Sequence, residues 1–319
     1  MTFAKIIGVG GYLPTRILTN EELGKSLNID TTWIESRTGI RQRYIADAAE
    51  STSDLALQAS EHALQAAGVT SNQLGLIIVA TSTPDLIFPS TACILQKKLK
   101  AGDCPAFDIQ AVCAGFTYAL HLASKLMQAG DVQYALVVGA DSFSRFLDWE
   151  DKTTCVLFGD GAGAVVLSKS DAPGILASSI QSSTANQEAL QVRGQVRNGQ
   201  IWGDPFIRME GRTVLKHAVC TMSATCRGLL NSCSLQINDV NWLILHQANT
   251  RIIEAVAEHL GCAGERVIKT ISNHGNTSAA SIPLALNESI QQGKIKPGDK
   301  VLIAGIGAGF TSGGALFII

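Results

Sequence analysis

Short runs of valine, isoleucine and leucine alternate with helical patterns along most of the chain, and this alternation limits the possible folds more than any other feature. The runs LGLIIVA (74–80) and YALVVGA (134–140) are continuously apolar, which is typical of strands buried on both faces. Residues 114–130 follow a helical pattern that ends at a glycine, and Ser53 and Asp54 can cap another helix. The alternation predicts an α/β fold with a largely parallel sheet.

The second half of the chain repeats the order of elements in the first half. Residues 241–261 have the strand–loop–helix order of residues 74–99. A strand over 267–271, a helix and a strand over 300–305 then follow in the same order as their counterparts in the first half. Such a repeat indicates an internal duplication, with its junction near 170–176.

The duplication divides the chain into two similar halves, residues 1–172 and 173–319. Two such halves place their equivalent loops face to face across a pseudo-twofold axis. In α/β folds, ligands bind at the carboxyl ends of the strands. We therefore expect the functional site in the loops that connect these strand ends to the helices.

The composition excludes several classes of protein. Apolar residues make up 46% of the 319 residues and charged residues 16%, which predicts a large buried interior and excludes disorder. The 25 Lys and Arg against 27 Asp and Glu form no basic stripe, so we expect no nucleic-acid partner. No apolar run approaches the roughly 18 residues of a spanning helix, and residues 1–14 have the pattern of a strand rather than a signal peptide. We expect a cytoplasmic protein with no membrane partner.

One of the eight cysteines stands apart from the others. The cysteines form no C-x-x-C pair, and without an export signal we predict neither a disulfide framework nor structural zinc. Most of them should be small buried apolar residues. Cys113, however, lies between a strand and a helix that opens with Ala-Gly. The positive end of the helix dipole favours a thiolate at this position.

Two further residues can join Cys113 in a reactive site. His246 ends the apolar strand LIL, where a core side chain is expected. Asn276 precedes small residues that open a helix, and the internal repeat places it in the loop equivalent to that of Cys113. A buried cysteine, a core histidine and a helix-capping amide are the structural alternatives. If the two helix starts meet, all three residues reach one cavity.

The same three residue types occur in papain-like proteases, where the histidine is a base that the asparagine orients. The local signature around the protease cysteine is missing here, and a duplicated α/β layout does not suit that class. Two glycine-rich loops, 159–164 and 305–310, lead into strands, so neither has the context of a dinucleotide site. The second loop instead predicts an oxyanion hole near Ala308.

Six motifs resemble one family. AVCAGFTYAL, LHQAN, HGNTSAAS, FGDGAGA, WIESRTGIRQR and GAGFTSGGAL are together similar to β-ketoacyl-[acyl-carrier-protein] synthase III, a thiolase-fold condensing enzyme. The resemblance runs from KIIGVGGYLP to the final strand. It implies a duplicated, layered αβαβα fold of two pseudo-symmetric halves, and a homodimer.

The resemblance also implies an activity. The enzyme would be an acyltransferase that condenses a short acyl-CoA, acetyl-CoA, with malonyl-acyl-carrier protein under loss of carbon dioxide. The product, 3-oxoacyl-acyl-carrier protein, initiates fatty-acid synthesis. The chemistry needs no metal or cofactor, since CoA and phosphopantetheine are parts of the substrates. Cys113 would carry the acyl group, and His246 and Asn276 would hold the malonyl thioester carbonyl. The backbone N–H groups of Cys113 and Ala308 would form the oxyanion hole.

The resemblance assigns binding roles as well. The CoA-binding residues are Trp33, Arg37 and Lys152. The acyl-pocket residues are Phe143, Phe158 and, reaching from the partner subunit of the dimer, Phe88. The carrier-protein residues are Lys216, Gln247, Ala248, Asn249, Thr250 and Arg251. Glu258 and His259 reduce the positive charge of the surface beside these residues. Segment 186–206 matches little in the family and is expected to shape substrate choice.

Two other functions remain open at this point. The first is a synthase III-like enzyme of secondary metabolism, with a different starter or a CoA extender. The second is a non-catalytic CoA-binding subunit of a dimer. The complete set of Cys113, His246 and Asn276 argues against the second function, because a subunit without chemistry has no physical need for all three.

Overall fold

The computed structural model of the protein describes residues 3–319. The first half forms a five-stranded sheet in the order β1-β7-β6-β4-β5. Its strands are β1 (Phe3–Tyr12), β7 (Asp160–Ser170), β6 (Tyr134–Ser142), β4 (Leu76–Ala80) and β5 (Ala106–Ile109). Strand β4 runs parallel to β5 and β6, whereas β7 is antiparallel to both β6 and β1.

The second half repeats this pattern in a four-stranded sheet, in the order β13-β14-β15-β8. The strands are β13 (Trp242–Leu245), β14 (Lys300–Gly307), β15 (Thr311–Ile318) and β8 (Ile175–Ser182). Here too a parallel pair, β13 and β14, is followed by two antiparallel strands. Both sheets are therefore mixed, not largely parallel as predicted. The tight turn between β14 and β15 permits only antiparallel pairing, because parallel strands need a long crossover.

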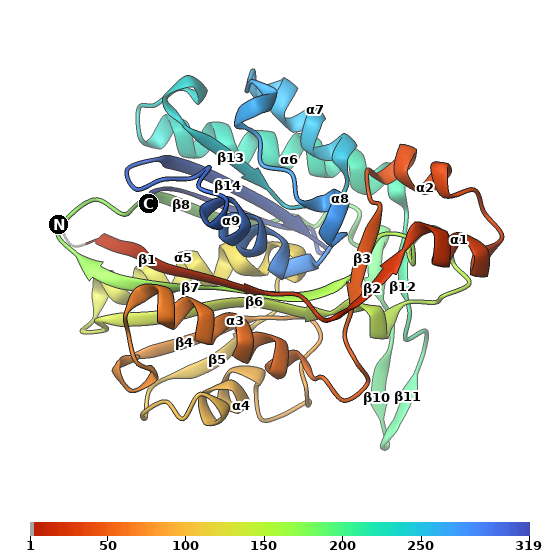
Figure 1. Ribbon diagram of the computed structural model, residues 1–319, viewed down its shortest axis with the longest axis horizontal. Coiled ribbons are helices and arrows are strands. Elements are labelled where there is room, and N and C mark those ends of the chain that lie inside the picture. Colours follow the sequence, from red (N-terminus) through yellow and green to blue (C-terminus); the bar gives the residue numbers. More distant parts are fainter. Residues whose placement is uncertain (1–2) are drawn as a thin grey trace.

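Two helices fill the space between the sheets. They are α5 (Gly115–Ala129) and α9 (Ser281–Gln291), and each opens at the carboxyl end of its half's strands (Figure 1). Phe116 on α5 and Ile282 on α9 are buried in one apolar cluster with side chains of both sheets. The starts of the two inner helices meet: the hydroxyl of Ser278, just before α9, lies 3.5 Å from the sulfur of Cys113, just before α5.

Four further helices cover the outer faces (Figure 1). The first sheet is covered by α3 (Thr52–Ala67) and α4 (Thr91–Lys98), and the second by α6 (Gly211–Ser232) and α7 (Thr250–Leu260). The layers thus alternate helix, sheet, helix, sheet and helix. The duplicated αβαβα arrangement that the resemblance implies is confirmed.

The capping of α3 differs in detail from the prediction. Ser51, not Ser53, is the N-cap, and it forms a capping box with Asp54. The Ser53 hydroxyl instead hydrogen-bonds to the Asp85 carboxylate in the loop that follows β4. The helix ends at Gly68, whose φ of +65° is the left-handed conformation that favours glycine.

The predicted strand over 267–271 is wrong. Only an isolated bridge joins Val267 to Leu243, and Ile271 already begins α8 (Ile271–His274). The buried side chain of Gln247 replaces the missing strand partners. Its Oε1 accepts hydrogen bonds from the backbone N–H groups of Thr270 and Ile271, and its Nε2 donates to the Ile268 carbonyl.

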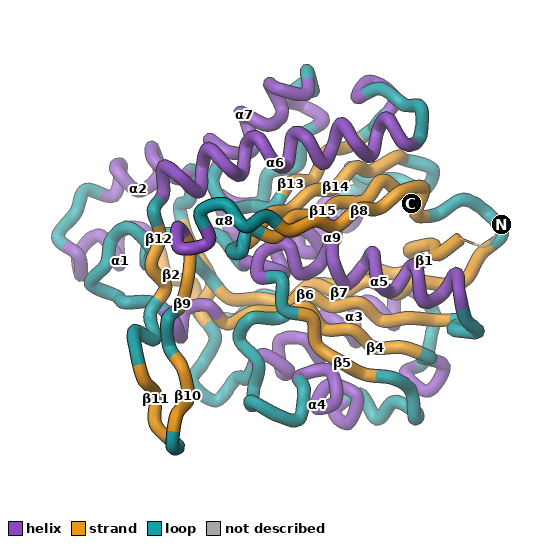
Figure 2. The backbone as a smooth tube through the Cα atoms, turned by 180° about the vertical axis from the view of Figure 1, so that it is seen from behind, coloured by secondary structure: helices purple, strands orange, loops and turns teal. Residues whose placement is uncertain are grey.

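Shorter elements extend from the layered body. Before α3 lie β2 (Arg16–Thr19), paired with β3 (Gln42–Ile45), and the helices α1 (Asn20–Leu27) and α2 (Thr31–Thr38). Segment 186–206 and the residues after it form two small strand pairs, of which one projects from the body as a hairpin (Figure 2). These strands are β9 (Leu190–Val192), β10 (Gln195–Arg197), β11 (Gln200–Trp202) and β12 (Ile207–Met209). Across residues 3–319, every helix is too short or too polar to cross a membrane.

Candidate active site

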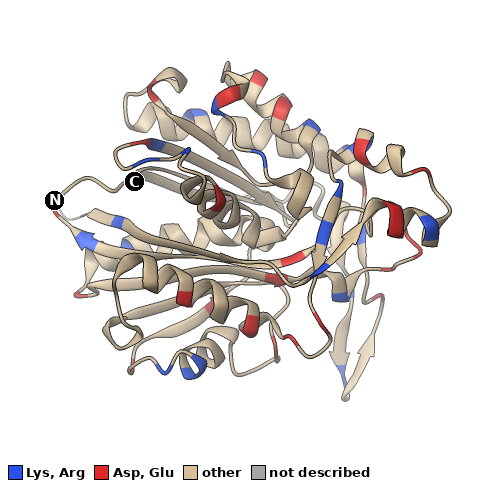
Figure 3. Ribbon diagram, viewed as in Figure 1, with Lys and Arg blue, Asp and Glu red and all other residues tan. Residues whose placement is uncertain are grey.

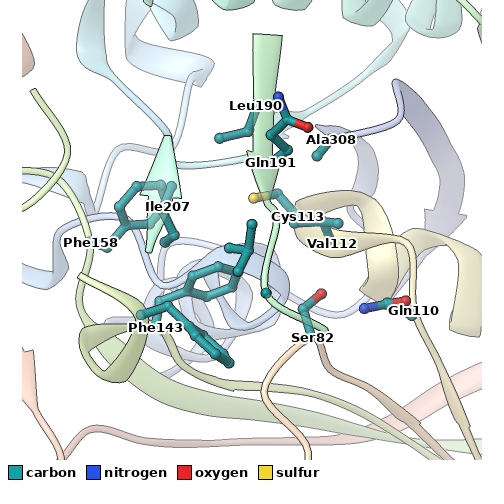
Figure 4. A pocket seen from close by; sticks show the side chains of 13 residues that line it. Ser82, Gln110, Val112, Cys113, Phe143, Phe158, Leu190, Gln191, Ile207 and Ala308 are labelled. Atoms are coloured by element: carbon teal, nitrogen blue, oxygen red, sulfur yellow. The ribbon is translucent and has the colours of Figure 1, made fainter. Parts of the chain in front are cut away.

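Cys113 lies in a tight turn, Val112–Ala114, between β5 and α5. Val112 has a φ of +47°, a left-handed conformation that a β-branched residue rarely adopts. Such strain persists only where the surrounding structure enforces it, and it is concentrated at functional sites. Here it accompanies a turn whose cysteine sulfur points into a cavity (Figure 4).

Two cavities meet at Cys113. The first has a volume of about 300 Å³ and includes Phe143 and Phe158, whose rings stack with their centroids 5.4 Å apart. Figure 4 shows the two rings on one side of this cavity and Ala308 on the other. The second cavity, of about 110 Å³, is lined by Cys113, His246 and Asn276 together. The structure therefore brings the three predicted reactive residues to one place.

His246 is held as a neutral imidazole. It is buried, and burial lowers its pKa to about 3. Its Nδ1 lies 2.7 Å from the Ser281 hydroxyl, which also accepts a hydrogen bond from the backbone N–H of Gln247. The hydroxyl keeps one proton that it can donate to Nδ1. In that tautomer the second ring nitrogen, Nε2, carries the ring proton and can donate to a ligand.

Asn276 is fixed by its own loop. Its side-chain Oδ1 accepts a hydrogen bond of 3.0 Å from the backbone N–H of Ser278. Its backbone N–H donates to the Leu157 carbonyl, and its carbonyl accepts from the Gly159 N–H. The amide oxygen is thus occupied, which leaves the NH₂ group of Asn276 as a donor for the cavity.

The thiol of Cys113 differs from the sequence expectation of a thiolate. The side chain is 4% exposed, and burial raises its pKa to about 12. A hydrogen bond from Ser278, whose Oγ lies 3.5 Å from the sulfur, lowers that pKa but does not offset the loss of solvent. The expectation was wrong because it considered the helix start alone and not the depth at which both sheets bury it.

The backbone near Ala308 lies against the turn of Cys113. A Cβ atom on Gly307 would come within 2.8 Å of the Cys113 nitrogen, so only glycine allows this approach. The Thr311 hydroxyl lies 2.8 Å from the Ala111 carbonyl and 3.2 Å from that of Ala308, which ties the two loops together. This arrangement suits an oxyanion hole built from backbone N–H groups of both halves.

The predicted CoA residues lie outside both cavities. Trp33 and Arg37 are exposed on α2, and Lys152 is exposed in the turn before β7. Arg37 is nevertheless close to the second cavity, because Asn249, which lines it, donates a 3.1 Å hydrogen bond to the Arg37 carbonyl.

The predicted carrier-protein residues do not form one surface. Gln247 is 1% exposed and fully engaged with the backbone, so its assignment to carrier binding is wrong. Ala248 and Asn249 line the second cavity, and Thr250 begins α7. The side chain of Gln247 points into the protein, because its amide hydrogen-bonds to the buried backbone of residues 268–271.

The basic residues of that set are exposed. Arg251 donates a 3.0 Å hydrogen bond to the Ser36 carbonyl on α2, and Lys216 lies exposed on α6. Figure 3 marks acidic residues in red on the ribbon of α7. The helix carries Glu254 and Glu258, both exposed. The surface therefore carries both signs of charge, in line with the thin basic face expected from the sequence.

The sequence analysis missed several residues of the site. Ser278 and Ser281 stand in the motif HGNTSAAS, but their side-chain contacts are visible only in the structure. Asp141 directly follows an apolar strand, and a carboxylate at the end of a buried strand was a signal that could have identified it. Leu190 and Ile207 line the first cavity without any signal in the sequence.

Phe88 is 81% exposed and does not line either cavity of its own chain.

Within residues 3–319, no group of three or more His, Cys, Asp and Glu side chains is arranged to hold a metal ion.

Comparison with known proteins agrees with this geometry. Residues 107–184 match the family 3-Oxoacyl-[acyl-carrier-protein (ACP)] synthase III, and residues 230–319 match the family of its C-terminal part. The β-ketoacyl-[acyl-carrier-protein] synthase III of Neisseria meningitidis is 50% identical over 317 residues, which are 99% of each chain.

Two crystal structures of 3-oxoacyl-[acyl-carrier-protein] synthase III superpose closely. The Aquifex aeolicus structure is 44% identical, with a TM-score of 0.94 over 99% of this chain and 100% of the other. The Pseudomonas aeruginosa structure is 39% identical, with a TM-score of 0.93 over 99% and 98%. With this identity over 99% of its length, and with Cys113, His246 and Asn276 lining one cavity, the chain belongs to the β-ketoacyl-[acyl-carrier-protein] synthase III family.

Proposed function

We propose that the protein condenses acetyl-CoA with malonyl-acyl-carrier protein to give 3-oxoacyl-acyl-carrier protein, the first condensation of fatty-acid synthesis. The observation that carries this proposal is the cavity that Cys113, His246 and Asn276 line together in a member of this family. The protein is an acyltransferase of the condensing class, and each residue has a role that its surroundings support.

The first half-reaction acylates Cys113. The sulfur attacks the thioester carbonyl of acetyl-CoA, and the oxygen of the tetrahedral intermediate is held by the backbone N–H groups of Cys113 and Ala308. The carbon–sulfur bond to CoA then breaks, and acetyl remains on the enzyme. The covalent intermediate divides one difficult condensation into two easier steps.

The second half-reaction decarboxylates the malonyl group. Loss of carbon dioxide leaves an enolate, whose oxygen accepts hydrogen bonds from Nε2–H of His246 and the amide of Asn276. Both groups are neutral, which suits a buried cavity where an ion would be costly. The enolate carbon attacks the acetyl thioester, and Cys113 leaves as the 3-oxoacyl product forms. No step calls for a metal or redox cofactor, since CoA and phosphopantetheine are substrate groups.

The first cavity is proposed to hold the acyl group. The stacked rings of Phe143 and Phe158, together with Leu190 of β9, form part of its lining. The bulk of the two rings supports a short starter such as acetyl. Segment 186–206 contributes this wall, and we propose that it shapes the choice of starter.

A homodimer is proposed to complete that cavity. Leu86, Ile87 and Phe88 are exposed in one loop, with fractions of 52%, 78% and 81%, and Ile201 and Trp202 are exposed on the β10–β11 hairpin. Exposed apolar groups of this size commonly mark a protein interface. We propose that Phe88 closes the acyl cavity of the partner subunit.

The substrates reach the cavity from the α2 and α7 side in this proposal. Trp33, Arg37 and Lys152 would hold the nucleotide end of CoA, with the indole stacking on adenine. Arg251 and Lys216 would meet the acidic carrier protein, mainly affecting association. We place the reaction in the cytoplasm.

Intact-mass measurement after incubation with acetyl-CoA tests the proposal. One acetyl adduct should form and map to Cys113, and Cys113→Ala should form none. Absence of any adduct on the wild-type protein would instead favour the non-catalytic subunit.

A panel of acyl-CoA starters, offered with malonyl-carrier protein or malonyl-CoA, separates primary from secondary metabolism. Turnover with acetyl-CoA and the carrier substrate supports fatty-acid initiation. Preference for a longer starter or for the CoA extender would favour the secondary-metabolism alternative, which the 50% identity to the Neisseria synthase does not favour.

A further inference from the structure

Asp141 is a fully buried carboxylate at the carboxyl end of β6, and neither of the two half-reactions above uses it. One of its oxygens, Oδ1, accepts hydrogen bonds from the loop that follows β4. The donors are the backbone N–H of Ser82 at 2.8 Å and the hydroxyls of Thr81 and Thr83 at 3.1 and 3.2 Å. The other oxygen, Oδ2, accepts a 3.2 Å hydrogen bond from the backbone N–H of Ala279, just before α9. The carboxylate therefore joins the first sheet to the second half of the chain.

The charge of Asp141 is stabilised by these hydrogen bonds and by no cation. The carboxylate takes part in none of the ion pairs within residues 3–319. Burial raises its pKa to about 6, so at neutral pH most of the group is still ionised and both oxygens accept hydrogen bonds. A buried charge is costly unless its hydrogen bonds are complete. The loops that carry the donors are therefore held close to Asp141.

The turn that contains Ala279 also fixes Asn276. The side-chain Oδ1 of Asn276 accepts its 3.0 Å hydrogen bond from the backbone N–H of Ser278, the residue directly before Ala279. Ser278 has a φ of +50°, a conformation that residues other than glycine rarely adopt. Such a conformation persists only where the surrounding structure enforces it, and the hydrogen bond from Ala279 to Asp141 is one such contact. The direction of the Asn276 amide thus depends on a carboxylate of the other half.

The backbone of β6 lies directly against this turn. Gly139 stands two residues before Asp141, and a Cβ atom added to it would collide with the carbonyl oxygen of Ala279. Only glycine permits an approach this close. The turn is therefore held by β6 in two ways, through backbone packing at Gly139 and through the hydrogen bond to Asp141.

The same carboxylate holds part of the wall of the first cavity. Ser82 and Phe143 both line that cavity (Figure 4). Ser82 donates to Asp141 directly, and Phe143 follows Asp141 by two residues. A 2.8 Å hydrogen bond from the backbone N–H of Ser142 to the Thr83 hydroxyl fixes the end of β6 against the same loop. Asp141 thus connects the first cavity to the turn before α9.

We propose that Asp141 is a positioning residue for decarboxylation, which holds the turn after Asn276 so that the Asn276 amide can donate to the enolate oxygen. The proposal rests on the function above, because it takes Asn276 as a donor in the second half-reaction. Asp141 itself contacts no reacting atom in this scheme. It acts through the backbone of Ala279 and keeps its own charge throughout.

Asp141→Asn tests the proposal, because it replaces one acceptor oxygen by an NH₂ group of similar size. The remaining oxygen can still accept from the loop after β4, and the NH₂ group would then face the N–H of Ala279, where two donors repel each other. Release of ¹⁴CO₂ from malonyl-carrier protein should fall by roughly 10²-fold, the cost of a misplacement of about 1 Å. Acetylation does not use Asn276, so intact mass should still show an acetyl adduct. Rates are expressed per acetylated chain, which excludes misfolded protein.

A double-mutant cycle separates positioning from a general loss of stability. In the Asn276→Ala background, Asp141→Asn should cause little further loss, because the group that it positions is already absent. His246 still donates in this background, so the residual release stays measurable. Asp108→Asn is the matched control, since this carboxylate of the same sheet accepts two backbone N–H groups at the start of α4. Any loss that it causes should be the same factor with and without Asn276.

A second variant leaves the carboxylate in place. Cell-free translation with a suppressor tRNA that carries lactic acid replaces Ala279 by its hydroxy-acid analogue, in which an ester oxygen stands where the N–H was. The side chain is unchanged, but the donor to Asp141 is lost. This variant should show a similar loss of carbon dioxide release, which should again disappear in the Asn276→Ala background. It decides the question if Asp141→Asn does not fold.

The outcomes distinguish this proposal from the proposed function. A wild-type protein that is never acetylated on Cys113, or normal release of carbon dioxide by Asn276→Ala, would contradict the proposed function itself. Wild-type release by folded Asp141→Asn or by the hydroxy-acid variant would overturn the positioning role alone. An equal loss with and without Asn276 would overturn it as well, because Asp141 would then act independently of that amide.

Discussion

Asn276 can donate a hydrogen bond but offers no nitrogen that takes up a proton at neutral pH. Its role is therefore confined to stabilising the enolate, and acylation should not depend on it. Asn276→Ala should still accept acetyl from acetyl-CoA, whereas release of carbon dioxide from malonyl-carrier protein should fall by about 10²–10³, the typical cost of one such donor. Intact mass and ¹⁴CO₂ release measure the two half-reactions separately.

The exposed amide of Asn231 on α6 provides the control, and Asn231→Ala should change neither half-reaction. If Asn276→Ala released carbon dioxide normally but could not be acetylated, Asn276 would act in acylation and not in stabilising the enolate.

The pKa of His246 gives a second prediction at the scale of a residue. The pKa is lowered to about 3 in the folded protein, against about 6.5 in an unfolded chain. As the pH falls from about 7 to about 5, the unfolded state binds the proton first, so the folded state loses about 2 kcal/mol of free energy of unfolding. Asp141 acts in the opposite sense, because its raised pKa lets the folded state bind a proton first.

A comparison of His246→Gln with the wild type isolates the histidine. The variant keeps Asp141, so between these two pH values it should lose about 2 kcal/mol less of its free energy of unfolding than the wild type does. Urea unfolding at both pH values measures the difference. Equal losses in the two proteins would mean that His246 is protonated in the folded state.

Reasoning from the sequence succeeded for residues whose neighbours in the chain carry the signal. Cys113, His246 and Asn276 each end a strand or open a helix, and the structure brings them to one cavity. It failed for the charge of Cys113, because the pKa of a thiol depends on burial by both halves. Asp141 and Ala279, whose backbone N–H donates to that carboxylate, belong to different halves, so their contact cannot be seen along the chain.

At the scale of elements, Gln247 shows how one side chain replaces a strand. The backbone of 268–271 has few partners in a sheet, and the Gln247 amide supplies them. Gln247→Ala would leave buried backbone groups without hydrogen bonds, each worth about 1–3 kcal/mol. We expect the free energy of unfolding to fall by about 2–4 kcal/mol in urea titrations.

The variant Gln128→Ala, which changes an exposed glutamine on α5, is the matched control and should stay close to the wild-type stability. The experiment also decides between the two roles of Gln247. If Gln247 were a docking residue, its replacement by alanine would raise the KM for the carrier substrate and leave stability unchanged. Its burial implies instead that the replacement lowers stability.

The continuous apolar runs predicted their strands well. LGLIIVA contains β4, and YALVVGA forms the first seven residues of β6. The predicted strand at 267–271 was wrong although its β-branched residues suit a strand. The side chain of Gln247, and not a neighbouring strand, hydrogen-bonds to its backbone N–H groups. Segment 186–206 gave no signal, since its strands are three residues long and mostly exposed.

The duplication acts at the scale of the whole molecule. Each half supplies a sheet and an inner helix, and the site forms where α5 and α9 begin. The duplication was predictable because the order of elements repeats in the sequence, whereas the αβαβα layering was implied by the family resemblance. The division at residues 172 and 173 stays a prediction, although it falls in the connection between β7 of the first sheet and β8 of the second.

The proposed dimer gives the last prediction. Phe88 lines neither of the two cavities at Cys113 in its own chain, so in the proposed dimer it would act on the partner subunit. Phe88→Ala should impair turnover, and Cys113→Ala should abolish it. In a mixed dimer of the two variants, however, the chain that keeps Cys113 receives an intact Phe88 from its partner. Mixing the two variants should therefore raise the activity per Cys113 above that of Phe88→Ala alone.

Native mass spectrometry of differently tagged chains confirms that mixed dimers form before activity is measured. The control mixture combines Cys113→Ala with a Phe88→Ala, Cys113→Ala double variant, and it should stay inactive at every ratio. No chain in the test mixture carries both Phe88 and Cys113. Recovery of activity therefore requires that the Phe88 ring be supplied across the interface. If mixed dimers form but the activity per Cys113 stays at that of Phe88→Ala alone, Phe88 does not act on the partner subunit.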